Sequence, residues 1–443
     1  MPQATFHFPR GFLWGTATSS HQVEGNNRNN NFWAWEQQPG RIVGGQKSGL
    51  ACDWWGGRWR EDFERIVEGG QNAHRFSIEW SRVQPTPDRW DEDALDHYRE
   101  MLRRLYELKI TPLVTLHHFC DPLWVSELGG WENEAIINLF EAYVKKTVQA
   151  LSEYANLWIT INEPNVLVIF AYLLGTFPPG KKSLSSIGRV YANLVRAHSS
   201  AYHTIHNVQP TARVGYAVNY RSFIPSHAWN PLDRMSASLA SSVFNNAFPG
   251  AINDGVLRLI LTRKRIPEAR GTQDFLGLNY YTRDQVVFSL LHPEEHFIHL
   301  FLRPGAELST TGFIANEPAG MFEALKWGTQ FNIPIIITEN GIEDQDDRIR
   351  PRYLLQHLHQ VWRGINFNWP IKGYFHWTLV DNFEWERGWT QRFGLWEIDI
   401  ETQIRKKRPS ADLFAEICSN NKISSEMVEK YAPQIYDQMF PGL

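Results

Sequence analysis

Two glutamates in this sequence each follow a short apolar stretch that is typical of a buried strand. Glu163 comes two residues after Leu157–Ile161, and Glu339 comes immediately after Ile335–Thr338. Short apolar runs with β-branched residues are typical of strands buried on both faces of a parallel sheet. In parallel α/β folds, reactive groups lie where such strands end. Two carboxylates placed in this way are the equipment of glycoside hydrolysis.

Each of the two motifs also has a purely structural interpretation. The Asn-Gly pair at 340–341 is a strong signal for the two-residue turn of a β-hairpin. However, the following residues 343–350 are charged and do not alternate as a second strand would. Asn162 and Pro164 are suited to the cap and first turn of a helix, but that role does not require Glu163 between them. We therefore favour strand ends that carry carboxylates.

Further polar and aromatic side chains stand at the ends of other predicted strands. Amides, imidazoles, carboxylates and indoles at the mouth of a barrel suit a ligand that is rich in hydroxyl groups. Each residue is a weak signal alone, and the shared placement gives the group its weight. These candidates are Gln22, Arg75, His118, Asn162, Asn279, Tyr281, Trp377, Glu384 and Trp385.

Two of these positions have alternatives that the sequence leaves open. His117 and His118 could form a metal pair, but adjacent residues of a strand point to opposite faces and do not easily bind one ion. Arg75 lies within an apolar stretch, where its charge is costly unless a carboxylate pairs with it. That partner could belong to a structural salt bridge or to the floor of an active site.

The elements that must position these residues alternate along the chain. Eight stretches are predicted strands: Leu13–Ala17, Ala73–Ser77, Pro112–Leu116, Leu157–Ile161, Val214–Val218, Phe275–Leu278, Ile335–Thr338 and Gly373–Trp377. Six amphipathic stretches between them are predicted helices: Arg58–Glu68, Asp93–Leu108, Glu134–Tyr154, Ile187–Asn207, Asn316–Phe331 and Pro351–Asn366. This alternation predicts an α/β fold, a closed (β/α)8 TIM barrel.

The chain has no linker or low-complexity segment, so we expect a single catalytic domain over 1–443. The tail after about residue 421 carries a weak helical pattern, which predicts that it either docks on the barrel or frays. The segments Tyr220–Gly271 and Thr282–Thr311 are longer than usual connections. We expect them to be extended βα loops that shape the active-site pocket.

Composition excludes several classes of function. The net charge of −4 favours neither nucleic acid nor an anionic membrane as a partner. Three separated cysteines form neither a disulfide framework nor a zinc motif, which is typical of a reducing compartment. Residues 1–10 lack the apolar core of a signal peptide, and no run reaches the roughly 18 apolar residues of a membrane span. We therefore expect a cytoplasmic protein.

Taken together, the motifs resemble glycoside hydrolase family one, the β-glucosidase family, from Phe8 to about Arg408. The matching stretches are Phe12–Thr18, Gln22–Gly25, Arg75–Arg82, Thr160–Pro164, Thr338–Gly341 and Asp381–Trp385. The resemblance implies a (β/α)8 barrel, in agreement with the strand count, and a hydrolase that needs no cofactor and no metal.

The resemblance also implies a role for each candidate residue. Glu163 resembles the acid/base and Glu339 the nucleophile, with Arg75 and Tyr281 holding the nucleophile charged and oriented. The residues that resemble the sugar-binding groups of the family are Gln22, His118, Asn162, Asn279, Trp377, Glu384, Trp385 and Phe393. For this mechanism we expect the negative Glu339 to raise the pKa of Glu163, and the two carboxyl groups to lie about 5 to 5.5 Å apart.

Two positions bear on the choice of sugar. Phe119 stands where the family often has tryptophan, so a hydrogen bond from an indole N–H to a sugar hydroxyl is missing. This change relaxes the expected discrimination among glucose, galactose and fucose. Glu384 is retained, whereas family members that cleave phosphorylated sugars lack this carboxylate, because it would repel a phosphate. We therefore disfavour 6-phospho substrates.

The expected function is that of a retaining, exo-acting β-glycosidase, foremost a β-glucosidase, that acts on small β-glycosides or cello-oligosaccharides and so contributes to cellulose degradation. One alternative is a transglycosidase, in which an acceptor sugar replaces water. A non-catalytic sugar-binding protein would lack Glu163 or Glu339, and both are present. A metal-dependent barrel hydrolase would be distinguished by its sensitivity to chelators. The sequence leaves homo-oligomerisation open.

Overall fold

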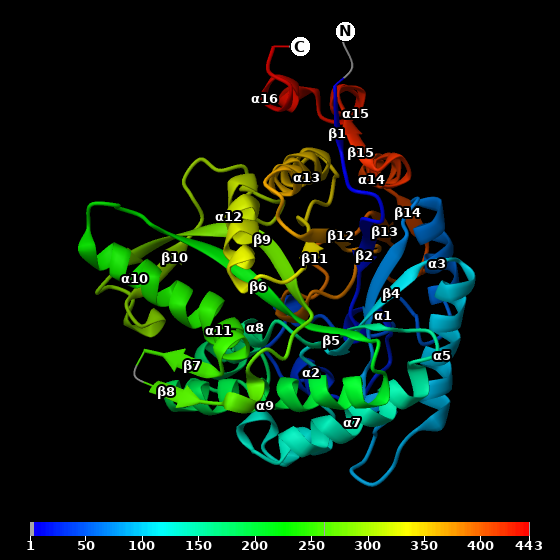
Figure 1. Cartoon of the computed structure of the whole chain (residues 1–443), viewed down its shortest axis with the longest axis vertical. Helices are drawn as coiled ribbons and strands as arrows, with labels where there is room; N and C mark the ends of the chain where they lie inside the picture. Colours follow the sequence, from blue (N-terminus) through cyan, green and yellow to red (C-terminus); the bar gives the residue numbers. More distant parts are fainter. Residues whose placement is uncertain (1–3, 261, 443) are drawn as a thin grey trace.

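Eight parallel strands form a closed barrel in the computed structural model, which describes residues 4–260 and 262–442 (Figure 1). In barrel order the strands are β2 (Leu13–Ala17), β3 (Ala73–Ser77), β4 (Thr111–His117), β5 (Leu157–Asn162), β6 (Arg213–Pro225), β9 (Phe275–Phe288), β11 (Ile335–Asn340) and β12 (Ile371–Trp377). The parallel pairing of β12 with β2 completes the ring. The predicted (β/α)8 barrel is therefore confirmed, and every predicted strand is present.

Amphipathic helices cover the outside of the barrel. The six predicted helices correspond to α3 (Trp59–Glu68), α5 (Glu92–Glu107), α7 (Ile136–Leu151), α9 (Leu184–Val208), α12 (Pro318–Gly328) and α13 (Arg350–Asn366). Helix α5 shows why such a segment folds here. Asp91 caps it by accepting a hydrogen bond from the backbone N–H of Ala94, and its buried residues recur at helical spacing. Helices α5, α9, α12 and α13 pack against barrel strands, and α3 and α7 pack beside α5.

The two long connections are more regular than the sequence predicted. Strands β6 and β9 run beyond the rim and stay paired as far as Pro225 and Val286. The first connection then forms α10 (Pro231–Ser241), α11 (Ala247–Asp254) and a hairpin of β7 (Val256–Leu259) and β8 (Thr262–Arg265), and the second adds β10 (Ile298–Phe301) antiparallel to β9. The predicted extended connections at 220–271 and 282–311 are therefore present, and they contain more strand and helix than their sequence indicates. These strand extensions are only half-buried, so they lack the continuous apolar run that marks the barrel strands.

The C-terminal segment packs beside the N-terminal strand at one end of the molecule (Figure 1). It consists of α14 (Pro409–Asn420), β15 (Lys422–Ser424), α15 (Ser425–Tyr431) and α16 (Tyr436–Met439), and β15 pairs with β1 (Thr5–His7). Asn421 fastens the junction, because its side chain donates to the carbonyl of Phe8 at 2.8 Å and accepts from the indole N–H of Trp14 at 2.8 Å. Of the two predicted outcomes for the tail, docking is the one observed.

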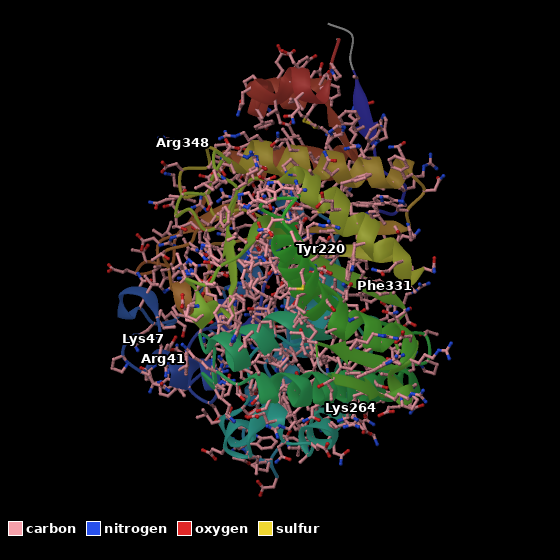
Figure 2. All side chains as sticks on the ribbon, turned by 90° about the vertical axis from the view of Figure 1, so that its left-hand side faces the viewer. Arg41, Lys47, Tyr220, Lys264, Phe331 and Arg348 are labelled. Carbon is pink, nitrogen blue, oxygen red and sulfur yellow. The ribbon has the colours of Figure 1, made fainter. Side chains whose placement is uncertain are left out.

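Side chains fill the space between the ribbons, while the labelled Arg41 and Lys47 lie at the outer edge of the molecule (Figure 2). No helix in the described ranges has both the length and the apolar character that a bilayer crossing demands.

A buried ion pair anchors the loop that follows β12. Asp381 accepts two hydrogen bonds from Arg408, at 2.8 and 2.9 Å, and one from the backbone N–H of Gly394 at 2.8 Å. Asp381 is completely buried, and Arg408 is 5% exposed. This pair holds the loop that carries Glu384 and Trp385 against the barrel rim.

We predict that Arg408→Met lowers the free energy of unfolding by about 3 to 5 kcal/mol, because it leaves the buried charge of Asp381 without its main partner. Lys407→Met is the matched control. Lys407 pairs with the exposed carboxylates of Glu68 and Asp412, so its loss costs about 0 to 1 kcal/mol. Urea denaturation measures both values. Equal losses in the two variants would contradict this role of the buried pair.

Candidate active site

A cavity of about 110 Å³ opens at the carboxyl ends of the barrel strands. Eight of the residues expected at the site line it: His118, Glu163, Tyr281, Glu339, Trp377, Glu384, Trp385 and Phe393. The other four, Gln22, Arg75, Asn162 and Asn279, lie behind these residues and are completely buried. Their side chains hydrogen-bond to the lining residues, so all twelve positions belong to one connected site.

Glu339 is held at the end of β11 by donors on both of its oxygens. Arg75 donates to Oε1 at 2.5 Å, and the hydroxyl of Tyr281 donates to Oε2 at 2.6 Å. Gly341 lets the chain pass close to β12 here, since a Cβ added to it would lie 2.0 Å from the carbonyl oxygen of Trp377. The hairpin interpretation of the Asn-Gly pair is excluded, because β11 pairs in parallel with both of its neighbours. This environment favours an ionised carboxylate at Glu339.

Glu163 lies between the end of β5 and the start of the short helix α8 (Pro164–Val168). Its backbone has φ 44° and ψ 58°, in the left-handed region that a non-glycine residue adopts only at a cost. Asn279 and Asn219 both donate to Oε1, at 2.8 and 2.9 Å. Because two N–H groups donate to Oε1, this oxygen is the carbonyl oxygen of the protonated carboxyl group. The acid proton therefore resides on Oε2.

Burial raises the pKa of Glu163 to about 8, and the negative charge of Glu339 is the second cause. We expected the charge of Glu339 to be the cause of this shift. Desolvation has the larger effect, because the carboxyl group is almost fully removed from water. Glu163 therefore carries a proton at neutral pH, next to an anionic neighbour.

A chain of hydrogen bonds behind the cavity wall links the two carboxylates. From Glu163 it passes to Asn279, whose amide also donates to Asn162 Oδ1 at 3.2 Å. The same oxygen accepts from Arg75 at 2.7 Å, and Arg75 reaches Glu339. The two acidic groups are thus fixed relative to each other by three buried side chains from three different strands, β3, β5 and β9.

The same network determines which nitrogen of His118 carries a proton. Because Asn162 Oδ1 accepts from two donors, its amide nitrogen donates to His118 Nε2 at 3.0 Å. The proton of the neutral ring is then on Nδ1, which is buried and has no partner among the described residues. Burial is the main cause that holds the pKa of His118 well below its usual range, and the nearby positive charge of Arg75 is the second cause. His118 therefore offers an unused N–H donor beside the cavity.

Glu384 lines the cavity and is oriented by Gln22. The Gln22 amide donates to Glu384 Oε2 and to the carbonyl of Phe383, both at 3.0 Å, while its own oxygen accepts from Ser19 at 2.6 Å. Burial, followed by repulsion from Glu386, holds the pKa of Glu384 well above its usual range.

His117 turns away from its neighbour, as the strand alternation predicted. Its Nε2 lies 2.9 Å from Asp121, while His118 contacts Asn162. The two rings therefore do not converge on one ion.

The sequence interpretation missed several residues that line the cavity. Asn219 follows the apolar stretch of β6 just as Asn162 follows that of β5, so the rule of polar residues at strand ends would have found it. Arg221 and Thr282 lie on the extensions of β6 and β9 beyond the barrel. The others come from connections, where no sequence pattern indicates an inward side chain: Val166, Phe170, Phe177, Phe244, Phe313, Ile314, Glu386 and Arg387. Phe119, which was noted as a departure, also lines the cavity.

Comparison with known proteins agrees with this geometry. The sequence matches the profile of glycosyl hydrolase family 1 over residues 4–423. The chain belongs to glycosyl hydrolase family 1. β-Glucosidase A of Thermotoga maritima is 33% identical, with 94% of this chain and 98% of the relative covered.

Two solved structures resemble this family 1 protein over almost its whole length. A β-glycosidase from Pyrococcus horikoshii superposes with a TM-score of 0.89 at 38% identity, covering 97% of this chain and 98% of the other. The β-glucosidase from Thermotoga maritima in complex with glucoimidazole gives a TM-score of 0.88 at 31% identity, with 94% and 99% covered. As a family 1 enzyme, the protein is a retaining β-glycosidase.

We predict that kcat/KM falls about tenfold per pH unit above pH 8, where Glu163 loses its proton. Asn219→Ala moves this basic limb to higher pH. The reason is that the Asn219 hydrogen bond lowers the pKa of Glu163, so its removal raises that pKa. Rates measured from pH 5 to 10 test the sign. A basic limb that moves to lower pH in the variant would contradict this effect of Asn219 on the pKa of Glu163.

Proposed function

We propose that this enzyme is a β-glucosidase that removes the terminal non-reducing glucose of small β-glucosides. Glu163 acts as the acid/base, and Glu339 acts as the nucleophile. One observation carries the proposal: two buried carboxyl groups share one cavity, and only Glu339 has a cationic side chain bonded to it. The difference in environment matches the two roles that retaining glycosidases require.

In the first step, Glu339 attacks the anomeric carbon and forms a glycosyl ester. Glu163 gives the proton on its Oε2 to the glycosidic oxygen, so the aglycone leaves as a neutral alcohol. Esterification removes the charge of Glu339 and with it part of the repulsion that kept Glu163 protonated. Glu163 then takes a proton from water, which cleaves the ester with overall retention. We propose a carboxyl separation of about 5 to 5.5 Å for this mechanism.

The sugar is bound by the remaining polar and aromatic groups of the cavity. His118 donates from Nδ1 to a sugar hydroxyl, and Glu384 contributes a carboxyl group oriented by Gln22. Trp377 presents an indole face to the ring, with Trp385 and Phe393 forming the adjoining walls. Asn162 and Asn279 act mainly by orienting His118 and Glu163.

The connections that shape the cavity favour an apolar aglycone. Four phenylalanines from these segments line it: Phe170, Phe177, Phe244 and Phe313. Aromatic rings retain an aryl group through dispersion and stacking, but they do not satisfy the hydroxyl groups of a second glucose. Within the expected range of substrates, this lining supports aryl β-glucosides over cello-oligosaccharides, and so argues against a primary role in cellulose degradation.

We propose that the whole chain acts as one catalytic domain, supported by the pairing of β1 with β15, which joins the N-terminal strand to the C-terminal segment. A cytoplasmic location is supported by Cys52, Cys120 and Cys418, which are all free and buried. The small glycoside is the partner that this site supports.

The nucleophile is tested with Glu339→Ala. We predict loss of hydrolysis of p-nitrophenyl β-glucoside, and its partial restoration by azide, which fills the space of the lost carboxylate. The product is then the α-glucosyl azide, because a single displacement inverts the anomeric centre. NMR spectroscopy identifies the anomer. A β-azide, or no rescue by azide in a folded variant, would contradict the role of Glu339.

The acid/base is tested with Glu163→Ala and a series of aryl glucosides. The first step loses most for poor leaving groups, which need a proton, and least for dinitrophenolate, which does not. Azide accelerates this variant too, but it yields the β-azide. Equal losses across the series of leaving groups would remove Glu163 from the acid role.

Phe119 is tested by restoring the indole. Phe119 is buried against Trp385, with ring centroids 5.1 Å apart, and the larger indole would place an N–H beside the sugar. We predict that Phe119→Trp raises kcat/KM for glucoside relative to fucoside by roughly 5-fold, the value of one hydrogen bond of about 1 kcal/mol. Phe119→Leu, which offers no donor, is the control. Equal selectivity in the two variants would contradict the prediction.

A further inference from the structure

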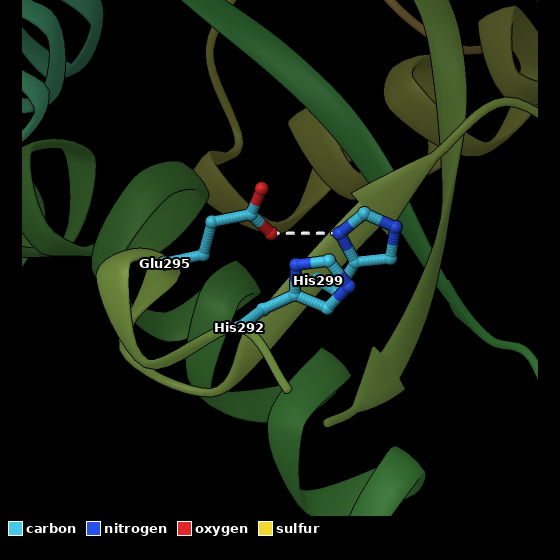
Figure 3. A group of neighbouring side chains, drawn as sticks. All are labelled: His292, Glu295 and His299. Carbon is cyan, nitrogen blue, oxygen red and sulfur yellow. Dashed lines mark hydrogen bonds and ion pairs between the residues drawn. The ribbon is translucent and has the colours of Figure 1, made fainter. Parts of the chain in front are cut away.

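A group of metal-binding side chains lies on the hairpin that β9 and β10 form, away from the cavity. In the described part of the chain, His292, Glu295 and His299 are the one set of three such residues whose ligand atoms all lie within 4.8 Å of one another. Figure 3 shows the Glu295 carboxylate facing the ring of His299, and the ring of His292 lies in front of the His299 ring. None of these residues takes part in the site described above.

Backbone hydrogen bonds, and not side-chain contacts alone, bring the three residues together. His292 precedes a single 3-10 turn, Pro293–Glu295, and its carbonyl accepts from the N–H of Phe297 at 3.0 Å. The N–H of Ser289 donates to the carbonyl of Phe297 at 3.0 Å, which closes the hairpin. The turn therefore fixes His292 and Glu295 beside His299, the second residue of β10.

The side chains have few other partners. Glu295 Oε2 lies 2.8 Å from Nδ1 of His299, and the rings of the two histidines stack with centroids 4.0 Å apart and planes 8° apart. The remaining contact of His292 is to the exposed Glu294 at 3.3 Å. Exposed pairs of this kind contribute about 0 to 1 kcal/mol to stability, so little stability is lost when a metal ion replaces them.

We propose that His292, Glu295 and His299 bind one divalent transition-metal ion of the zinc class. Two imidazoles and one carboxylate suit Zn²⁺, Co²⁺, Ni²⁺ or Cu²⁺, whereas Ca²⁺ and Mg²⁺ require oxygen ligands throughout. An imidazole binds an ion in the plane of its ring, so one of the two stacked rings turns when the ion enters. The side chains of His292 and His299 are 35% and 30% exposed, and no packed core opposes that rotation. Water completes the coordination.

The position of the group gives the ion a structural role. Strand β9 carries Tyr281 and Thr282, and the segment after β10 carries Phe313 and Ile314, so both arms of the hairpin continue into the wall of the cavity. An ion that joins the turn to β10 stiffens this hairpin. It does not contact the two carboxylates and takes no part in bond cleavage.

Isothermal titration of the chelator-treated full-length enzyme with Zn²⁺ alone tests the proposal. We expect one ion per chain. His292→Ala and His299→Ala each lower the affinity by at least roughly 100-fold, since even the partners of metal ligands contribute 10- to 100-fold. Glu295→Gln keeps the shape of the side chain and weakens binding by removing its charge.

The matched control is His296→Asn. It removes an imidazole from the same turn, and asparagine tolerates the positive φ of 54° at this position. This variant retains the affinity for Zn²⁺, and all four variants retain the glucosidase rate of the metal-free enzyme, which shows that they are folded. Absence of a one-to-one phase in the parent enzyme would overturn the proposal. Unchanged affinity in both His292→Ala and His299→Ala would overturn it as well.

Discussion

A single buried guanidinium joins the strand ends on which the site is built. Arg75 is completely buried, and its nitrogens donate to Thr115 on β4, Asn162 on β5 and Glu339 on β11. An arginine in this position is tolerated only because each of its nitrogens has an acceptor, and the planar shape of the group fixes the directions of those acceptors. The barrel can place Arg75 at its floor only when the ends of β4, β5 and β11 are in register around it. The fold and the geometry of the site are therefore one constraint.

The chemistry depends on the different surroundings that the fold gives to two similar residues, Glu339 and Glu163. Glu339 receives the guanidinium and a tyrosine hydroxyl, whereas Glu163 receives two neutral amides on one oxygen and is otherwise desolvated. The carboxylate of Glu339 is paired with a cation, whereas the pKa of Glu163 is raised to about 8. Neither state is a property of glutamate itself. Both arise from side chains that are distant in sequence and meet only when the barrel is closed.

The sequence predicted the parts of the fold that depend on continuous local signals. The apolar stretch Ile335–Thr338 marked a barrel strand, and the same rule located both glutamates. It did not predict the extension of β6 and β9, whose half-buried residues lack a continuous apolar run. Phe170, Phe177, Phe244 and Phe313 of the cavity were also missed, since nothing in their local sequence shows that they point inward. Asn219 was within reach of the rule that found Asn162.

The electrostatic details needed coordinates for a different reason. The protonated nitrogen of His118 and the larger effect of burial on Glu163 depend on which atoms face each other across strands. Neutron diffraction from deuterated crystals at pH 7 tests the central claim most directly. We predict a deuteron on Oε2 of Glu163 and none on either carboxylate oxygen of Glu339. A deuteron on Glu339, or an unprotonated Glu163 at that pH, would contradict the account.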